Sequence, residues 1–180
     1  MDYLILGFLT GLSLILAIGA QNIFVIEQGL KKQYIFIVCL ICSISDFLLI
    51  FLGIFLFQYL NHFFTPTIEL VFNILLLIFL LHFIWGKIKT KVSETSFDVD
   101  SKTNNLSNIV VKTLGFTFLN PHVYSDTVFF LGNFSKSLSQ VDKYYFGAGA
   151  AISSFLFFFI LGYLSKYFSK YLKSVKVWKR

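Results

Sequence analysis

Five long apolar runs cover most of this 180-residue chain, and they constrain its fold more than any other feature. The runs are residues 4–26, 35–60, 68–85, 109–131 and 144–168. Each exceeds the roughly 17 residues that a helix needs to cross the hydrocarbon core of a bilayer. Because lipid offers no partner for backbone N–H and C=O groups, such segments cross as helices. The sequence therefore predicts an all-α fold, a polytopic membrane helical bundle with five transmembrane helices.

The composition excludes a soluble globular domain. The chain is 57% hydrophobic and 13% charged, with a mean hydropathy of +0.78. A soluble domain with these values would expose a large apolar surface to water. The chain is therefore expected to be an integral membrane protein.

Basic residues gather on alternate connections between the runs. Lys31 and Lys32 follow the first run, and further basic residues lie between the third and fourth runs and after the fifth. The connection 61–67 has none, and 135–143 has only two. Since short cytoplasmic loops collect Lys and Arg, this pattern predicts an N-terminus outside and a C-terminus in the cytoplasm. The net charge of +6 is then a signal of topology, and no nucleic-acid partner is expected.

A polar segment, residues 88–107, divides the single membrane domain 1–180 into two units. We expect it to be a cytoplasmic linker between a three-helix unit, 1–87, and a second unit, 108–180, with two helices and a basic tail. If each unit has three spans in principle, the odd number makes the two units cross the membrane in opposite directions, as in an inverted repeat. The second unit has only two helices, so the pattern suggests an incomplete inverted repeat of three plus two helices. The lysines of the tail, 163–180, would suit either contact with anionic headgroups at the cytoplasmic face or an ordinary basic stop.

A carboxylate lies near the middle of the second run. Asp46 is about twelve residues into that run, close to mid-depth at ~1.5 Å per residue. A charge at this depth costs roughly 2.5–3.5 kcal/mol on insertion scales, so a carboxylate there is usually paired, hydrated or functional. Asp46 is therefore expected to be a proton or cation site, rather than an acid satisfied only by Ser or Asn on packed helices.

Two further polar side chains lie in the fourth run. Asp126 is in its outer half, where either a binding role or simple solvation would explain it. His122 could accept a proton or donate to a substrate carboxylate, or it could only hydrogen-bond a neighbouring helix. No metal site is predicted, because His62 and His82 lie near the ends of runs without ligand spacing. No cofactor is expected.

Two of the runs carry polar interruptions. They are Gly19-Ala20-Gln21-Asn22 in the first run and Asn120-Pro121-His122 in the fourth. Pro121 removes a backbone donor, and freed backbone groups at membrane depth are tolerated only where protein buries them or where they line a watery cavity. Paired interruptions in the two halves of a chain are typical of a transporter binding site. Both are expected in the cytoplasmic half of the membrane, where they could face one cavity.

The segments that carry these residues resemble a known family. They are Gly11-Leu12-Ser13-Leu14-Ile15-Leu16-Ala17-Ile18-Gly19-Ala20-Gln21-Asn22, Gln28-Gly29-Leu30, Ser45-Asp46 and Gly115-Phe116-Thr117-Phe118-Leu119-Asn120-Pro121-His122-Val123-Tyr124-Ser125-Asp126-Thr127. Together they resemble the lysine/arginine exporter branch of the LysE superfamily, in the same order and over nearly the whole chain. The G-A-Q-N and L-N-P-H-V-Y-x-D-T blocks are specific to that branch.

The resemblance implies a secondary active exporter of L-lysine and L-arginine, and not an enzyme, in the bacterial cytoplasmic membrane. Its driving force would be the membrane potential or a proton gradient. A cationic substrate needs carboxylates and amide oxygens along its path, which agrees with the residues found. The expected substrate- or ion-binding residues are Gln21, Asn22, Asp46, Asn120, His122 and Asp126, with Gly19 and Pro121 at the helix breaks.

Members of that family commonly have a sixth apolar span after a segment like residues 175–180. The resemblance therefore leaves three expectations open: function with five spans, completion through a homo-oligomer, or a truncated form with impaired transport. A cation or metal-ion exporter of similar architecture is the main alternative function. A lipid-modifying enzyme is disfavoured because no compact set of acid, base and nucleophile lies near one interface.

Overall fold

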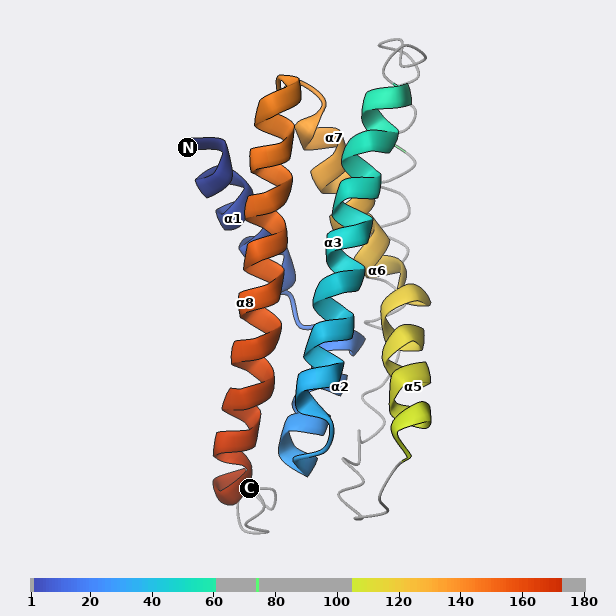
Figure 1. Cartoon of the computed structure of the whole chain (residues 1–180), viewed down its shortest axis with the longest axis vertical. Helices are drawn as coiled ribbons and strands as arrows, with labels where there is room; N and C mark the ends of the chain where they lie inside the picture. Colours follow the sequence, from blue (N-terminus) through green and yellow to red (C-terminus); the bar gives the residue numbers. More distant parts are fainter. Residues whose placement is uncertain (1, 61–73, 75–104, 173–180) are drawn as a thin grey trace.

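The structure, a computed structural model, describes residues 2–60, 74 and 105–172 (Figure 1). Every regular element in this part of the chain is helical, which confirms the all-α prediction. The elements are α1 Asp2–Ile15, α2 Ala20–Lys31, α3 Ile35–Leu60, α5 Leu106–Phe118, α6 Pro121–Tyr124, the π-helix η1 Ser125–Leu131, α7 Gly132–Ser135 and α8 Gln140–Leu172. The predicted third run (68–85, apart from Ile74), most of the predicted linker and the tail beyond 172 lie outside the described residues.

Two of the described helices are long and apolar enough to cross a membrane alone. They contain the segments Ile35–Leu56, of 22 residues, and Gln140–Ser169, of 30 residues. Helices α1 and α2 meet the same criterion only as a pair, and the pair is bent by 80°. The chain is therefore a multi-pass membrane protein, while the count of five spans and the inverted repeat stay predictions.

The first apolar run is not one helix, and its break lies earlier than the polar residues suggested. Helix α1 ends at Ile15 and α2 begins at Ala20, so Gln21 and Asn22 belong to the first turn of α2. Gly19 is the N-cap of α2, with extended backbone angles of φ −112° and ψ −178°. The side-chain amides of Gln21 and Asn22 thus lie on the first turn of α2, and the chain changes direction at residues 16–19, before them.

The fourth run is broken at the position expected from its proline. Helix α5 ends at Phe118, and α6 begins at Pro121 after two non-helical residues. Proline is tolerated at the first position of a helix because its missing N–H would have no partner there. The chain then continues through the wide turns of η1, which a purely α-helical reading of the run did not predict.

Helix α8 is the central support of the bundle, and small residues let its neighbours approach closely. A Cβ atom added to Gly149 of α8 would overlap the carbonyl oxygen of Leu4, and one added to Gly7 of α1 would overlap that of Phe146. Farther along α8, a Cβ at Gly162 would lie 2.7 Å from Sγ of Cys39 on α3. Small residues at helix interfaces are the usual means of tight packing in membranes, where apolar burial offers little driving force.

A buried apolar cluster joins three elements, the C-terminal half of α3, the end of η1 and the N-terminal half of α8. It consists of Ile50 and Ile54 from α3, Leu131 from η1, and Phe146 and Ala150 from α8. This cluster and the glycine contacts fix α3, η1 and α8 side by side. They therefore also fix the positions of Asp46 and Ser154, each about one helical turn from a residue of the cluster.

The described segments that the sequence predicts to be cytoplasmic lie at the same end of the bundle. The turn after Lys31, the start of α5 and the end of α8 all lie at one end, whereas the N-terminus and α7 lie toward the other (Figure 1). Within the first of these ends, Lys31 forms an ion pair of 2.8 Å with Glu27. The basic end is the one that the sequence predicts to be cytoplasmic, and the orientation itself stays a prediction.

Candidate functional site

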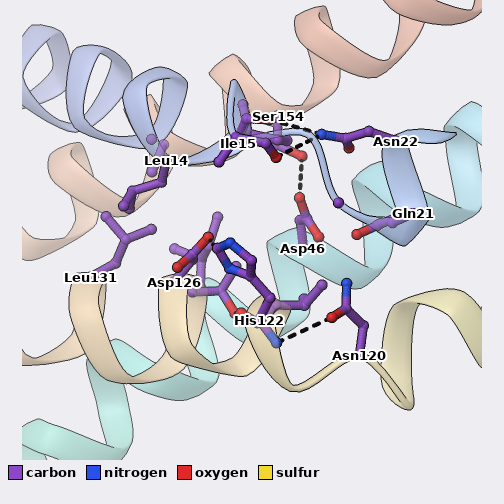
Figure 2. Close-up of a pocket in the computed structure, with 17 residues that line it drawn as sticks. Leu14, Ile15, Gln21, Asn22, Asp46, Asn120, His122, Asp126, Leu131 and Ser154 are labelled. Carbon is purple, nitrogen blue, oxygen red and sulfur yellow. Dashed lines mark hydrogen bonds and ion pairs between the residues drawn. The ribbon is translucent and has the colours of Figure 1, made fainter. Parts of the chain in front are cut away.

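The two helix breaks open into one pocket. It has about 540 Å³ of unfilled space, counted out to its open mouth. All six predicted binding residues line it, and so does Gly19. Among the described residues, the lining consists of Gly11, Leu14, Ile15, Ala17, Gly19, Gln21, Asn22, Asp46, Ile50, Asn120, His122, Val123, Asp126, Thr127, Leu131, Ala150 and Ser154 (Figure 2). Residues more than 100 positions apart in the sequence therefore share one cavity.

Asp46 is the most deeply buried acid of the pocket. Its residue is 5% exposed, and its Oδ2 accepts a hydrogen bond of 2.7 Å from the hydroxyl of Ser154 on α8. The other side of the carboxylate faces Gln21 (Figure 2). A buried carboxylate whose side-chain neighbours, here Ser154 and Gln21, are both neutral suits recognition of a cation.

Gln21 is buried beside this carboxylate. Its residue is 5% exposed, and its Nε2 has no hydrogen-bond partner within the described part of the chain. Buried amide donors are rarely left without an acceptor, so each case calls for an explanation. A guest in the pocket would supply the acceptor.

Asn22 is already engaged by the protein. Its Nδ2 donates to the carbonyl oxygens of Ile15, at 3.0 Å, and Ala17, at 3.1 Å. These are backbone groups that the end of α1 leaves without helical partners. The geometry thus gives the nitrogen of Asn22 a capping role at the break.

The second break brings Asn120, His122 and Asp126 to the opposite wall. Oδ1 of Asn120 accepts a hydrogen bond of 3.2 Å from the backbone N–H of His122, which caps the start of α6. Nδ1 of His122 lies 2.9 Å from Oδ2 of Asp126, one turn later. Both side chains are partly exposed, at 29% and 20%. When the imidazole is protonated, the two groups form an ion pair that a cationic substrate would have to displace.

Asp126 lies on the π-helix. The residues of η1 run from Ser125 to Leu131, and Thr127 of the same turn also lines the pocket. π-Helical turns inside α-helices are rare and occur often at functional sites. A wider turn changes which residues of the run face inward, so the pocket wall here could not be read from a regular helical spacing.

Ser154 was missed by the sequence reasoning, because several buried serines of α8 look alike in the sequence. The hydroxyls of Ser153, Ser165 and Ser169 each donate to a carbonyl of their own helix. Only the hydroxyl of Ser154 reaches Asp46. Thr127 was missed for a similar reason, since its hydroxyl bonds to the carbonyl of Val123 and its presence in the pocket follows from η1.

The pocket combines two acids with three amides and one imidazole. Within the described residues no group of three or more His, Cys, Asp or Glu side chains could hold a metal ion. The acids can bind a cation, and the amide nitrogens and the helix starts can bind an anionic group. Such a set fits a small molecule that carries both kinds of charge.

Several curated proteins are similar to this chain over most of its length. The chain is 35% identical over 183 residues to the arginine exporter protein ArgO of Pectobacterium atrosepticum, an alignment that covers 95% of this chain and 84% of the relative. The proteins of the same name from Salmonella paratyphi C and Klebsiella pneumoniae are each 34% identical, over 97% of this chain and 83% of the relative. No solved structure matches the chain significantly.

The sequence also matches a family profile over most of its length. That family is described as LysE type translocator, and the match extends over residues 12–180. It includes both helix breaks and every residue of the pocket except Gly11. The relatives and the profile point to a transporter rather than an enzyme. The chain therefore belongs to the family of LysE type translocators.

Proposed function

We propose that this protein exports arginine, and with it lysine, across the bacterial cytoplasmic membrane as a secondary active transporter. The observation that carries the proposal is the single pocket that gathers Asp46, Asp126 and the amides of two broken helices at membrane depth. The relatives named as arginine exporters support the same substrate class.

The chemistry of the pocket suits a basic amino acid. A guanidinium group presents several N–H donors in one plane and pairs well with carboxylates, while an ammonium group acts as a point charge. Asp46 offers a buried carboxylate, and Asp126 offers a second one that is now held by His122. A substrate cation that reaches Asp126 would take the place of His122.

The breaks suit alternating access. A pocket formed where two discontinuous helices meet can be opened to one side or the other when one group of helices rocks against the rest. In the predicted orientation, the pocket is loaded from the cytoplasmic end, where Lys31 and the end of α8 lie. The membrane potential or a proton gradient would drive the cation outward.

Efflux from cells tests this proposal. Cells that express the chain are loaded with radiolabelled arginine, lysine or leucine, and the loss of label is compared with that from cells carrying an empty vector. We expect faster loss of arginine and lysine and an unchanged loss of leucine. Equal loss of all three amino acids, or arginine loss at the vector level, would contradict the proposal. Loss of a divalent cation without loss of arginine would favour the metal-ion exporter instead.

A further inference from the structure

The two helix ends at the first break differ in how their backbone groups are satisfied. On the α1 side, Asn22 donates to the carbonyl oxygens of Ile15 and Ala17, and the N–H of Ala17 donates to the carbonyl of Leu14 at 3.1 Å. The negative end of the α1 dipole is thus covered by hydrogen-bond donors. It offers little competition for an anion in the same pocket.

The start of α2 has no such cover. The N-cap, Gly19, has no side chain that could accept a hydrogen bond from the first turn. The N–H of Ile23 is the first to bond along the helix, to the carbonyl of Gly19 at 3.1 Å. The N–H groups of Ala20, Gln21 and Asn22 come before it and have no acceptor within the helix. This end also carries the positive pole of the twelve-residue α2.

A second, independent observation points to a ligand at the same place. Nε2 of Gln21 is buried without a partner among the described residues, although Gln21 lines the pocket. Nδ2 of Asn120 approaches from the opposite wall, 3.7 Å from where a Cβ of Gly19 would lie (Figure 2). The unpartnered amide of Gln21 therefore belongs to the first turn of α2, and the amide of Asn120 lies close to the N-cap of the same helix.

The other break does not offer the same site. The N–H of His122, in the first turn of α6, is taken by Oδ1 of Asn120 at 3.2 Å. The helical run that begins at Pro121 continues through η1 and α7, but its first residue is a proline without an N–H, and the N–H of Val123 donates to the carbonyl oxygen of Asn120 at 3.1 Å. Among the described residues, the buried amide nitrogen of the pocket that has no partner, Nε2 of Gln21, thus lies on α2, and the acids Asp46 and Asp126 are the groups that a cation would seek.

We propose that the first turn of α2, together with Gln21, binds the α-carboxylate of the transported amino acid. The inference rests on the proposed export of basic amino acids. It adds the orientation of the substrate in the pocket, with the α-carboxylate at α2 and the side chain at the acids. Backbone N–H groups at a helix start favour a carboxylate, and the amide of Gln21 completes its set of donors. The side-chain cation of the substrate then points to Asp46 and Asp126. Glycine at position 19 leaves room for the carboxylate next to the backbone.

Agmatine, the decarboxylated analogue of arginine, separates this proposal from the export function. Binding of arginine and of agmatine is measured on the purified full chain in lipid nanodiscs. Wild-type protein should bind arginine about tenfold or more tightly than agmatine, because a hydrogen-bonded charged group is lost with the carboxylate. In Gln21→Met, which keeps the volume and removes the donor, arginine should bind about tenfold more weakly, with agmatine binding changed less than about twofold.

A second variant tests the same region without relying on Gln21. A Cβ at Gly19 would make only an ordinary contact with Asn120, and the extended backbone there accepts any residue, so Gly19→Ala should fold. Its methyl group should weaken arginine binding and spare agmatine binding. Gly115→Ala is the matched control, since nothing lies within 4 Å of a Cβ at that position, and it should change neither affinity.

The outcomes are distinguishable. Equal affinity of the wild-type protein for arginine and agmatine would overturn the carboxylate site and leave arginine export standing. Equal weakening of both ligands by Gln21→Met and by Gly19→Ala would also overturn it, because those residues would then act on the fold. If the wild-type protein bound neither ligand, the proposed function would fail together with the inference.

Discussion

The hydroxyl of Ser154 donates a 2.7 Å hydrogen bond to Oδ2 of Asp46, and this contact links α8 to the buried acid of α3. Both residues are buried, at 3% and 5% exposure. The bond holds the carboxylate of Asp46 toward the pocket and away from the apolar surface of the bundle. Ser154 is therefore a positioning residue for the acid on which the proposed substrate site depends.

Loss of this hydroxyl should impair transport without unfolding the protein. In Ser154→Ala, the carboxylate of Asp46 loses the 2.7 Å hydrogen bond from α8, and a hydrogen bond to a charged group contributes about 1.5–3 kcal/mol. Arginine efflux is expected to fall about tenfold or more, at an unchanged amount of protein in the membrane. Ser153→Ala is the matched control, because the hydroxyl of Ser153 bonds only to Ala150 of its own helix. Equal losses in the two variants would contradict the positioning role.

Protonation of His122 should oppose substrate binding. A protonated imidazole pairs with Asp126 across the 2.9 Å contact, so a substrate cation has to compete for that carboxylate. In His122→Gln the side chain carries no charge, so arginine should bind more tightly than to the wild-type protein. Binding measurements on the two proteins at one pH check this, and equal affinities would rule out the competition.

Asn22 and Gln21 should respond differently to substitution, although they are neighbours. Asn22→Ala removes two partly buried hydrogen bonds, to the carbonyls of Ile15 and Ala17, and a typical hydrogen bond contributes about 0.5–1.5 kcal/mol. We therefore expect a lower midpoint of thermal unfolding for Asn22→Ala in detergent. Gln21→Met removes an amide nitrogen that has no hydrogen-bond partner among the described residues, so it should lower this temperature less than Asn22→Ala does. A stable Asn22→Ala protein would show that the cap is dispensable.

The interface of α1 and α8 should tolerate no added methyl group. In Gly149→Ala the new Cβ would overlap the carbonyl oxygen of Leu4. Overpacking of this kind costs about 1–3 kcal/mol and sometimes more. The variant should unfold at a lower temperature than the wild-type protein, while Gly115→Ala should not. An unchanged unfolding temperature for Gly149→Ala would mean that α1 moves aside without loss of stability.

The sequence predicted which polar residues share a pocket better than it predicted how the helices place them. Hydropathy located the helices α3 and α8, because long apolar runs have only one stable form in lipid. Gly19 and Pro121 marked the two breaks, since each residue disturbs a helix for a known physical reason. All six predicted binding residues line one pocket, as expected from paired interruptions.

Three features had no local signal. The 80° bend between α1 and α2 depends on what the helices pack against, and no residue type encodes it. The π-helical turns of η1 could not be told from α-helical turns by the pattern of apolar residues. Ser154 could not be told from Ser153, because the partner of a buried hydroxyl depends on the rotation of α8 relative to α3. Tertiary packing decides all three.

Arginine efflux from cells expressing Asp46→Asn tests the central claim most directly. The side chain keeps its size and loses its charge, and Asp142→Asn, at the start of α8 and outside the pocket, serves as the control. We predict that Asp46→Asn reduces efflux to the level of the empty vector, with normal membrane insertion, and that Asp142→Asn exports arginine at the wild-type rate. Wild-type efflux in Asp46→Asn would contradict the account.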